Sequence, residues 1–280
     1  MTTKVDVRQT IGPDETARHG TQALRDAFLL GGLFTPGEAR LTLSHFDRVI
    51  VGGIAPLAES VALGPVREAG TASLLDRREA AIVNIGGRGA VSVGDTVHAL
   101  GHREALYVGV GGGDLSFATV DPGEPALFFL VSAPAHRTCP TVVITRDRAR
   151  KVALGSAEEA NARTIRQYVH PEVCESCQLL LGITEFEPGS VWNTMPAHLH
   201  DRRMEVYLYF GMSPQARIVH LMGKPDETRH LVVANQEAVL SPPWSIHAGA
   251  GTGRYSFIWA MAGDNQDFAD MDMVPMEALR

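Results

Sequence analysis

Short apolar runs follow one another along most of the chain, and glycine, proline and aspartate separate them. Between residues 39 and 133 the runs are ARLTLSHF, DRVIVGGIA, SVALG, AAIVNIGG, GAVSVG, TVHALG, EALYVG, DLSFATV and ALFFLVSA. Such short runs, bounded by turn residues, predict β-strands. Their spacing of about ten residues is typical of a β-sandwich or barrel. A second series of the same kind runs from Cys177 to about Met261.

Two segments have a helical pattern instead. Thr21 is placed to cap a short helix that continues through Phe28, with Gly31 and Gly32 ending it. The sequence SAEE at residues 156–159 is a capping-box signature and predicts a helix over residues 160–169. We expect the polar residues 1–18 to form an arm, and the acidic tail to form an arm or a short helix.

The two strand series define the expected organisation of the chain. An N-terminal arm with a short helix is followed by a first β unit, a linker with a helix, a second β unit and a tail. We place these segments at residues 1–38, 39–135, 136–176, 177–263 and 264–280.

The two β units also resemble each other. RREAAIVNIGG at residues 77–87 is similar to RRMEVYLYFGM at residues 202–212, and VGVGGGDLSF at residues 108–117 to AGAGTGRYSF at residues 248–257. In these frames Ala80 falls where Glu205 stands, and Tyr107 where His247 stands. The repeat therefore predicts that the first unit lacks a set of polar groups that the second unit carries.

That polar set is the candidate chemistry of the chain. His198, His200 and Glu205 lie within eight residues, just before an apolar run that reads as a strand, and His247 follows a proline-rich turn. Imidazole and carboxylate are ligands that divalent transition metals accept. Alternation along an extended segment places both nearby histidines on one side. The competing interpretation is a pair of surface histidines beside charged residues, because a chain with 11 histidines contains His-x-His readily by chance.

Composition excludes several classes of function. The chain has 280 residues, 45% of them hydrophobic and 20% charged, which is typical of a globular protein. The net charge of -7 gives no basic surface for nucleic acid. No apolar run is long enough for a membrane span, and the polar start, Met1 to Gln9, does not read as a signal peptide. Three cysteines, an odd number, favour a reducing compartment, so we expect a cytoplasmic protein. We interpret Cys174 and Cys177 as structural or incidental, since no second ligand pair accompanies them.

The metal-ligand spacing resembles that of the cupin family. Cupins carry His-x-His, three or four residues, then Glu, and later Pro-x-Gly-x-x-His. Here four residues separate His200 from Glu205, and Pro242 stands five residues before His247, although Trp244 replaces the glycine. The resemblance implies a mainly β chain with two cupin barrels (double-stranded β-helix, jelly-roll), of which only the second binds metal.

A closer resemblance covers nearly the whole chain. The strings HFDRVIVGGIAP, GHREALYVG, EPGSVWNTMPAHLHDRRMEVYLYF, SPPWSIHAGAGTGRYSFIWAMAGDNQ and FADMDMV are similar to those of the bicupin 4-deoxy-L-threo-5-hexosulose-uronate ketol-isomerase family. Membership implies a homohexamer with one Zn²⁺ per subunit and a small deoxy-keto-uronate substrate from pectin breakdown. The family's zinc ligands carry over onto His198, His200, Glu205 and His247.

An aldose–ketose isomerase also needs a group that moves protons and a group that binds the substrate's carboxylate. Candidates for the first role, close to the ligands in sequence, are Tyr207, Lys224 and His230. Candidates for the second role are Arg202, Arg203 and Arg229. Arginine matches the planar geometry of a carboxylate with two parallel hydrogen bonds.

Three other functions agree with the same residues. A 5-deoxy-glucuronate isomerase of inositol breakdown would share the architecture and the reaction type. An iron dioxygenase would use the same ligands for redox chemistry, and a sugar-binding cupin would bind without turnover. Substrate assays, oxygen consumption and metal analysis separate these possibilities.

Overall fold

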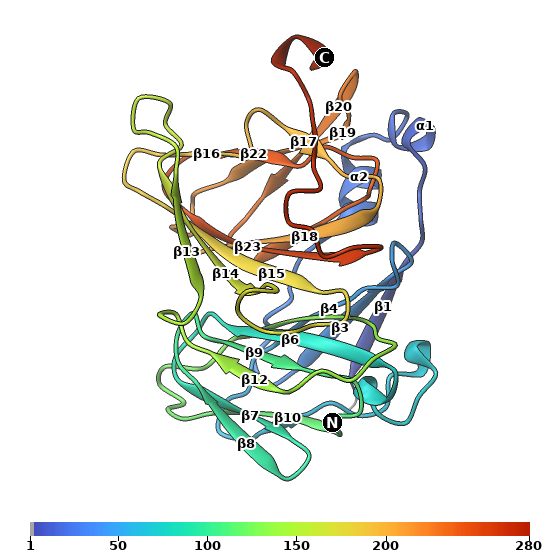
Figure 1. The fold of residues 1–280 in the computed structure, drawn as a ribbon, viewed down its shortest axis with the longest axis vertical. Coiled ribbons are helices and arrows are strands. Elements are labelled where there is room, and N and C mark those ends of the chain that lie inside the picture. Colours follow the sequence, from blue (N-terminus) through green and yellow to red (C-terminus); the bar gives the residue numbers. More distant parts are fainter. Residues whose placement is uncertain (1–2) are drawn as a thin grey trace. The chain divides into compact units, whose positions relative to one another are not determined.

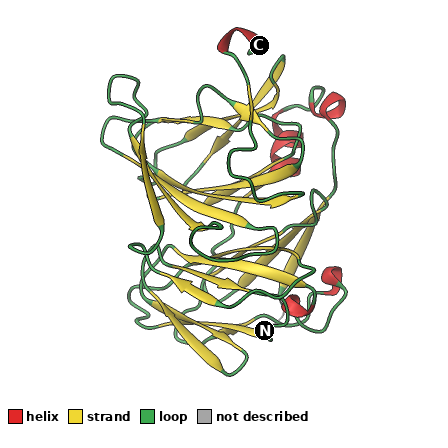
Figure 2. Ribbon diagram, in the orientation of Figure 1, coloured by secondary structure: helices red, strands yellow, loops and turns green. Residues whose placement is uncertain are grey.

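The computed structural model describes residues 3–280, which form two compact units (Figure 1). The first unit contains the N-terminal residues up to Arg8, Gly32–Arg150 and Tyr168–Leu181. The second unit contains Gln9–Gly31, Lys151–Gln167 and Gly182–Arg280. Each unit therefore includes segments from outside its main stretch of chain. Strands dominate both units and helices are few, as the sequence predicts (Figure 2).

The first unit encloses its core between two sheets. One sheet has the order β1-β3-β4-β11-β6-β9-β12 and the other has the order β5-β10-β7-β8. All nine apolar runs predicted between residues 39 and 133 are strands, β3 to β11. Their inward side chains form a continuous apolar core. The strands of this unit are β1 (Lys4–Arg8), β3 (Ala39–Ser44), β4 (Ile50–Ile54), β5 (Val61–Ala62), β6 (Arg78–Asn84), β7 (Gly89–Val93), β8 (Thr96–Leu100), β9 (Ala105–Val108), β10 (Leu115–Thr119), β11 (Phe128–Pro134) and β12 (Val142–Ile144).

The second unit has the same plan. Its larger sheet has the order β13-β14-β15-β23-β18-β21-β2, its smaller sheet the order β16-β22-β19-β20, and β17 pairs with β24. These strands are β2 (Leu29–Leu30), β13 (Arg150–Leu154), β14 (Arg163–Val169), β15 (Leu180–Phe186), β16 (Trp192–Asn193), β17 (His198–Leu199), β18 (Arg203–Phe210), β19 (Ile218–Lys224), β20 (Glu227–Val233), β21 (Glu237–Ser241), β22 (Ala248–Gly251), β23 (Ser256–Gly263) and β24 (Asp272–Met273).

The internal repeat is visible in the strand pairing. Strand β6 lies between β11 and β9 as β18 lies between β23 and β21, and these registers place Ala80 at the position of Glu205. The predicted equivalence of Tyr107 with His247 is wrong, because the same registers align Tyr107 with Leu240. The similar glycine-rich strings led to a frame that the strand pairing does not follow.

The predicted N-terminal helix is confirmed as α2 (Thr21–Phe28), which buries Leu24 and Phe28. The predicted cap is wrong: Gly20 occupies the N-cap position without a side-chain hydrogen bond, and Thr21 is the first helical residue. The expected arm at residues 1–18 contains α1 (Pro13–Thr16) and β1, which pairs in parallel with β3. The remaining helices of the described chain are single 3-10 turns, η1 (Arg67–Ala69), η2 (Leu74–Asp76) and η3 (Met276–Ala278).

The helix predicted over residues 160–169 is also wrong. The hydroxyl of Ser156 does accept the backbone N–H of Glu159, at 3.2 Å, as a capping box requires. The turn ends at Ala160, whose positive φ of 53° directs the chain out of the helical path. The following residues form β14, which is rich in β-branched and aromatic side chains and lies beside β15 in the larger sheet.

The cysteines are buried, and among residues 3–280 all three are free. Cys177, which the alternating pattern places in a strand, precedes β15 instead. Its backbone N–H donates to the buried carboxylate of Glu79 at 2.6 Å, and those of Gln178 and Leu179 donate to the same carboxylate at 2.7 and 2.8 Å. These three N–H groups are therefore not available for hydrogen bonds to a neighbouring strand. No helix among the described residues is both long and apolar enough to cross a membrane.

The close packing of the second unit gives a stability prediction. A Cβ at Gly182 of β15 would overlap the indole of Trp259 and come within 2.7 Å of the backbone oxygen of Arg166. We expect Gly182→Ala to lower the free energy of unfolding by about 1–3 kcal/mol, the usual effect of overpacking. Gly253→Ala is the matched control, because nothing lies within 4 Å of the place that its methyl group would take. Equal thermal unfolding midpoints for the two variants would contradict this packing.

Candidate metal centre

Four side chains of the second unit converge on one point. His198 belongs to β17, His200 follows it, Glu205 lies on β18 and His247 directly precedes β22. The ligand atoms of these four residues all lie within 4.8 Å of one another. Among the residues that the structure describes, this is the only such group of His, Cys, Asp and Glu.

Local backbone geometry brings these side chains together. Strand β17 pairs with β24, so that His198 lies opposite Met273. A turn closed by the backbone N–H of Arg203 and the carbonyl of His200, at 3.3 Å, then leads into β18. There Glu205 is held between Ser241 of β21 and Met261 of β23.

Hydrogen bonds orient two of the imidazole rings. Nδ1 of His200 lies 2.9 Å from the backbone oxygen of Arg203, and Nδ1 of His247 lies 3.2 Å from the hydroxyl of Ser241. The Nε2 atoms therefore face the common point. Partners on the distal nitrogen fix the orientation of a metal-binding histidine in this way.

The distances within the group fit a small cation. Oε2 of Glu205 lies 3.2 Å from Nε2 of His200 and 3.0 Å from Nε2 of His247, which is 3.0 Å from Nε2 of His198. A tetrahedral cation with bonds of about 2.0–2.1 Å separates its ligand atoms by about 3.3 Å. The nitrogen and oxygen donors present therefore match a divalent metal in type and in spacing.

The electrostatics of the group favour the metal-binding forms of His198 and Glu205. Burial and, to a smaller extent, the neighbouring His247 lower the pKa of His198 to about 3. Burial alone would raise the pKa of Glu205, but His247 and His200 outweigh it and hold that pKa well below its usual value. Burial alone would lower the pKa of His200, and its hydrogen bond to Glu205 reverses this, so that the pKa is raised. A neutral imidazole and an ionised carboxylate are the forms that bind a cation.

A cavity of about 270 Å³ opens beside His198 and Glu205. One face of the larger sheet forms much of its wall, through alternate residues of four adjacent strands. These residues are Arg163 and Ile165 of β14, Thr184 of β15, Phe257, Trp259 and Met261 of β23, and Arg203, Glu205 and Tyr207 of β18. The rest of the wall comes from Leu154, Thr194, Met195, Pro196, Phe268, Met271 and Met273. The site is therefore a largely apolar chamber with a few polar groups, as small-molecule sites usually are.

The structure brings only one candidate for proton transfer to this cavity. Tyr207 lies in the wall, with its hydroxyl 3.4 Å from that of Thr194. Burial, with a contribution from the Glu205 charge, raises the pKa of Tyr207 well above its usual value. Lys224 and His230 are exposed on the β19–β20 hairpin, and neither is among the described residues that line the cavity.

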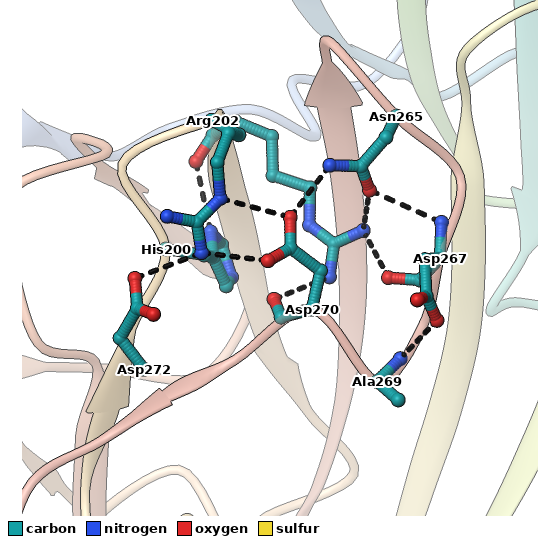
Figure 3. A network of polar contacts seen from close by, with 8 residues as sticks. His200, Arg202, Asn265, Asp267, Ala269, Asp270 and Asp272 are labelled. Carbon is teal, nitrogen blue, oxygen red and sulfur yellow. Dashed lines mark hydrogen bonds and ion pairs between the residues drawn. The ribbon is translucent and has the colours of Figure 1, made fainter.

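The three predicted carboxylate-binding arginines have partners within the protein, and Figure 3 shows those of Arg202. Arg229 pairs with Glu227 at 2.7 Å and lies outside the cavity wall. Arg202 forms ion pairs with Asp270 at 2.6 Å and with Asp272 at 2.8 Å. Arg203 is completely buried, and its guanidinium binds the tail that follows β23. Its Nη atoms donate to the side chain of Asn265 and to the backbone oxygens of Asp267 and Asp270, at 2.7–3.2 Å.

The tail, expected from its composition to form an arm or a short helix, contains the short 3-10 helix η3 and also forms part of the cavity wall. Phe268 packs on Trp259 with ring centroids 5.4 Å apart, and both rings line the cavity. Tail residues Met271 and Met273 complete this wall. No sequence pattern indicated this role. The tail reads as an acidic segment, because acidic residues separate the three apolar side chains that line the cavity.

Arg163 is another cavity residue that sequence patterns did not reveal. It lay in the segment predicted as a linker helix, so nothing connected it with the histidines. The one sequence feature that points to it is that the arginine begins an alternating run, RTIRQYV. Such a run is as typical of a strand as of the predicted helix.

Comparison with known proteins identifies the family of the chain. The KduI/IolB family matches residues 36–276. The chain belongs to this family. The KduI/IolB member named 4-deoxy-L-threo-5-hexosulose-uronate ketol-isomerase 1 from Rhizobium meliloti (strain 1021) is 69% identical over 280 residues, which is 100% of both chains. The protein named 4-deoxy-L-threo-5-hexosulose-uronate ketol-isomerase from Shouchella clausii (strain KSM-K16) is 51% identical over 276 residues, 99% of this chain and 100% of its own. This KduI/IolB chain is an isomerase.

Solved structures show the same fold at low identity. An IolB-like protein from Salmonella typhimurium LT2 matches with a TM-score of 0.67 and 18% identity, over 81% of this chain and 87% of that chain. The oxalate decarboxylase of Lactobacillus farciminis in its formate complex matches with a TM-score of 0.57 and 10% identity, over 81% and 79%. The mainly β, cupin-like fold class expected for a KduI/IolB protein is confirmed.

The buried contacts of Arg203 give a prediction about the tail. Arg203→Met keeps most of the volume but leaves the backbone oxygens of Asp267 and Asp270 without their donor. We expect it to lower the free energy of unfolding by about 3 kcal/mol and to speed amide hydrogen exchange in the tail at residues 264–273. Arg202→Met is the control and should have a smaller effect, because its ion pairs are exposed to solvent. Unchanged exchange in the Arg203 variant would show that this guanidinium does not hold the tail.

Proposed function

We propose that this chain converts 5-dehydro-4-deoxy-D-glucuronate (4-deoxy-L-threo-5-hexosulose uronate) into 3-deoxy-D-glycero-2,5-hexodiulosonate, a step in uronate catabolism. The observation that carries the proposal is the full-length identity of 69% to a relative that bears the name of this activity. The cavity beside a ready set of metal ligands supports it, because it provides a chamber for a small molecule.

We further propose that His198, His200, Glu205 and His247 hold one Zn²⁺ per subunit. Three nitrogen donors and one oxygen donor, two of them oriented by second hydrogen bonds, suit zinc. When bound, such a cation acts as a Lewis acid towards the developing negative charge on the substrate's oxygens. An aldose–ketose interconversion requires this, since loss of a proton from the hydroxyl-bearing carbon gives an enediol-type intermediate.

Tyr207 is the proposed proton-handling group of the cavity. Its raised pKa keeps the phenol protonated at neutral pH, so that its hydroxyl is a hydrogen-bond donor. Its ring lies 5.5 Å, centroid to centroid, from that of His247, next to the metal ligands. A donor at this place hydrogen-bonds a substrate oxygen as negative charge develops there. The apolar wall of Phe257, Trp259 and Met261 keeps bulk water away from the same region.

The homohexamer and the cytoplasmic location belong to the same proposal. Both rest on the resemblance to the uronate isomerases, and the low cysteine content supports the second. Light scattering of the purified protein and fractionation of its host cells test them directly.

Turnover of the predicted substrate tests the function. We expect the purified protein to consume the 4-deoxy-5-keto uronate released by pectate lyase and oligogalacturonide lyase, with the hexodiulosonate as the only product. The assay follows product by NMR while an electrode records oxygen. Turnover of 5-deoxy-glucuronate alone would instead assign the inositol pathway. Oxygen uptake would indicate a redox cupin, and saturable binding without turnover would indicate a sugar-binding protein.

Metal removal tests the ligand set. Chelation should abolish turnover, and readdition of Zn²⁺ should restore it, because a cation held by these ligands supplies the charge that stabilises the enediol-type intermediate. We expect His200→Ala to bind less than a tenth of the wild-type zinc, measured by elemental analysis, with turnover reduced at least in proportion. His230→Ala, which removes an exposed histidine, is the matched control and should retain both. Full metal content in the His200 variant would refute the assignment.

A further inference from the structure

The cavity contains two permanently charged side chains besides the proposed metal ligands. They are Arg163 of β14 and Arg203 of β18. A substrate with a carboxylate needs a cation to receive it, and arginine does so best, with two parallel N–H donors. The binding site for the carboxylate therefore depends on which of the two arginines has such donors free.

Arg203 is committed to the protein itself. Both of its Nη atoms donate to oxygens of the tail, from Asn265, Asp267 and Asp270. Its Nε–H has no partner within the described structure, so it offers one donor and not a fork. Glu205 follows it by two residues on the same face of β18, so Arg203 lies at the metal end of the cavity.

Arg163 has a different environment. It is half-buried, and its Nη1 donates to the backbone oxygen of Asn161 at 2.8 Å. The nearest acidic side chain in the sequence, Glu159, is exposed and accepts from the side-chain amide of Asn161 at 3.2 Å. Arg163 lines the cavity together with Ile165, two residues further along the same face of β14. The charge of Glu159 acts on Arg163, but among the described residues no carboxylate is within ion-pair distance of the guanidinium, which lines the cavity.

The position of Arg163 across the sheet suits the substrate's length. Strands β15 and β23 lie between β14 and β18, so three strand spacings, about 14 Å, separate the backbones that carry Arg163 and Glu205. The substrate's carboxylate is five bonds from its aldehyde carbon, about 6 Å when extended. The two side chains and their contacts with the ligand fill the remainder. An arginine at the metal end, such as Arg203, would be too close to the reacting carbons.

We infer that Arg163 binds the carboxylate of the substrate and so orients the aldehyde end towards the four metal ligands. This inference rests on the proposed uronate isomerase function. It replaces Arg202, Arg203 and Arg229, which the structure assigns to contacts within the protein.

The test compares the substrate with its uncharged methyl ester. The wild-type enzyme should favour the acid in kcat/KM by about 10- to 100-fold, the contribution of a charge-assisted hydrogen-bond pair. Arg163→Gln should raise the KM of the acid by that factor and change kcat much less, because the carboxylate is remote from the reacting carbons. The KM of the ester should stay within about threefold, so that the preference disappears. Arg163→Lys, which keeps the charge but not the fork, should lie between the two.

Arg229→Ala is the matched control, and it should keep the wild-type preference for the acid. The ratio of acid to ester is measured within each variant, so a partly inactive preparation does not alter it. Zinc content equal to that of the wild type would show that the metal ligands are undisturbed. A wild-type ratio in Arg163→Gln would overturn this inference and leave the isomerase function standing. Failure of the wild-type enzyme to turn over the acid would overturn both.

Discussion

Four polar groups of the second unit meet at one buried point. Their mutual repulsion and their loss of hydration constrain the structure of this unit. His200, Glu205 and His247 are each at most 4% exposed, yet their nitrogen and oxygen atoms face one another at hydrogen-bond distance. Polar groups buried in this way are stable only when each has a partner. Without a cation, protons must be shared among three imidazoles and one carboxylate. A divalent cation satisfies all four at once, so the ligand geometry and the stability of this part of the barrel are expected to be linked.

The cost of burying polar groups also explains the role of Arg202 and Arg203, which lie between the ligands in the sequence. The buried guanidinium of Arg203 is stable because the tail wraps round it and supplies oxygen acceptors. That wrapping places Phe268 and the tail methionines over the cavity. The Arg203 side chain thus contributes to the apolar cavity wall indirectly, because it fixes the position of the tail, and the tail carries the apolar side chains. Arg202 adds exposed ion pairs to the same segment, so consecutive residues hold the tail from the inner and the outer side.

The sequence predicted what depends on short-range patterns. Alternation and turn residues identified the strands β3 to β11, and the spacing of His198, His200 and Glu205 indicated the ligand group. It failed where tertiary contacts decide. A real capping interaction at Ser156 starts no helix, because Ala160 turns the chain and the next residues gain a strand partner. Arg163 stands in that strand, so the wrong local assignment also hid it from the site. The prediction for the tail failed for the same reason, since contacts with residues distant in sequence, among them Arg202 and Arg203, determine where the tail lies.

Comparison of the two units separates fold from site. Their sheets have matching strand orders, and Ala80 of the first unit occupies the place of Glu205 in the second. Ala80 belongs to an apolar core with Ile82, Leu106 and Leu130, and the described residues of the first unit hold no cluster of metal-ligating side chains. The fold alone therefore does not assemble a group of metal-ligating side chains. In the second unit strand ends supply the histidines, a carboxylate stands where the first unit has a methyl group, and the arginine three strands away lines the same cavity.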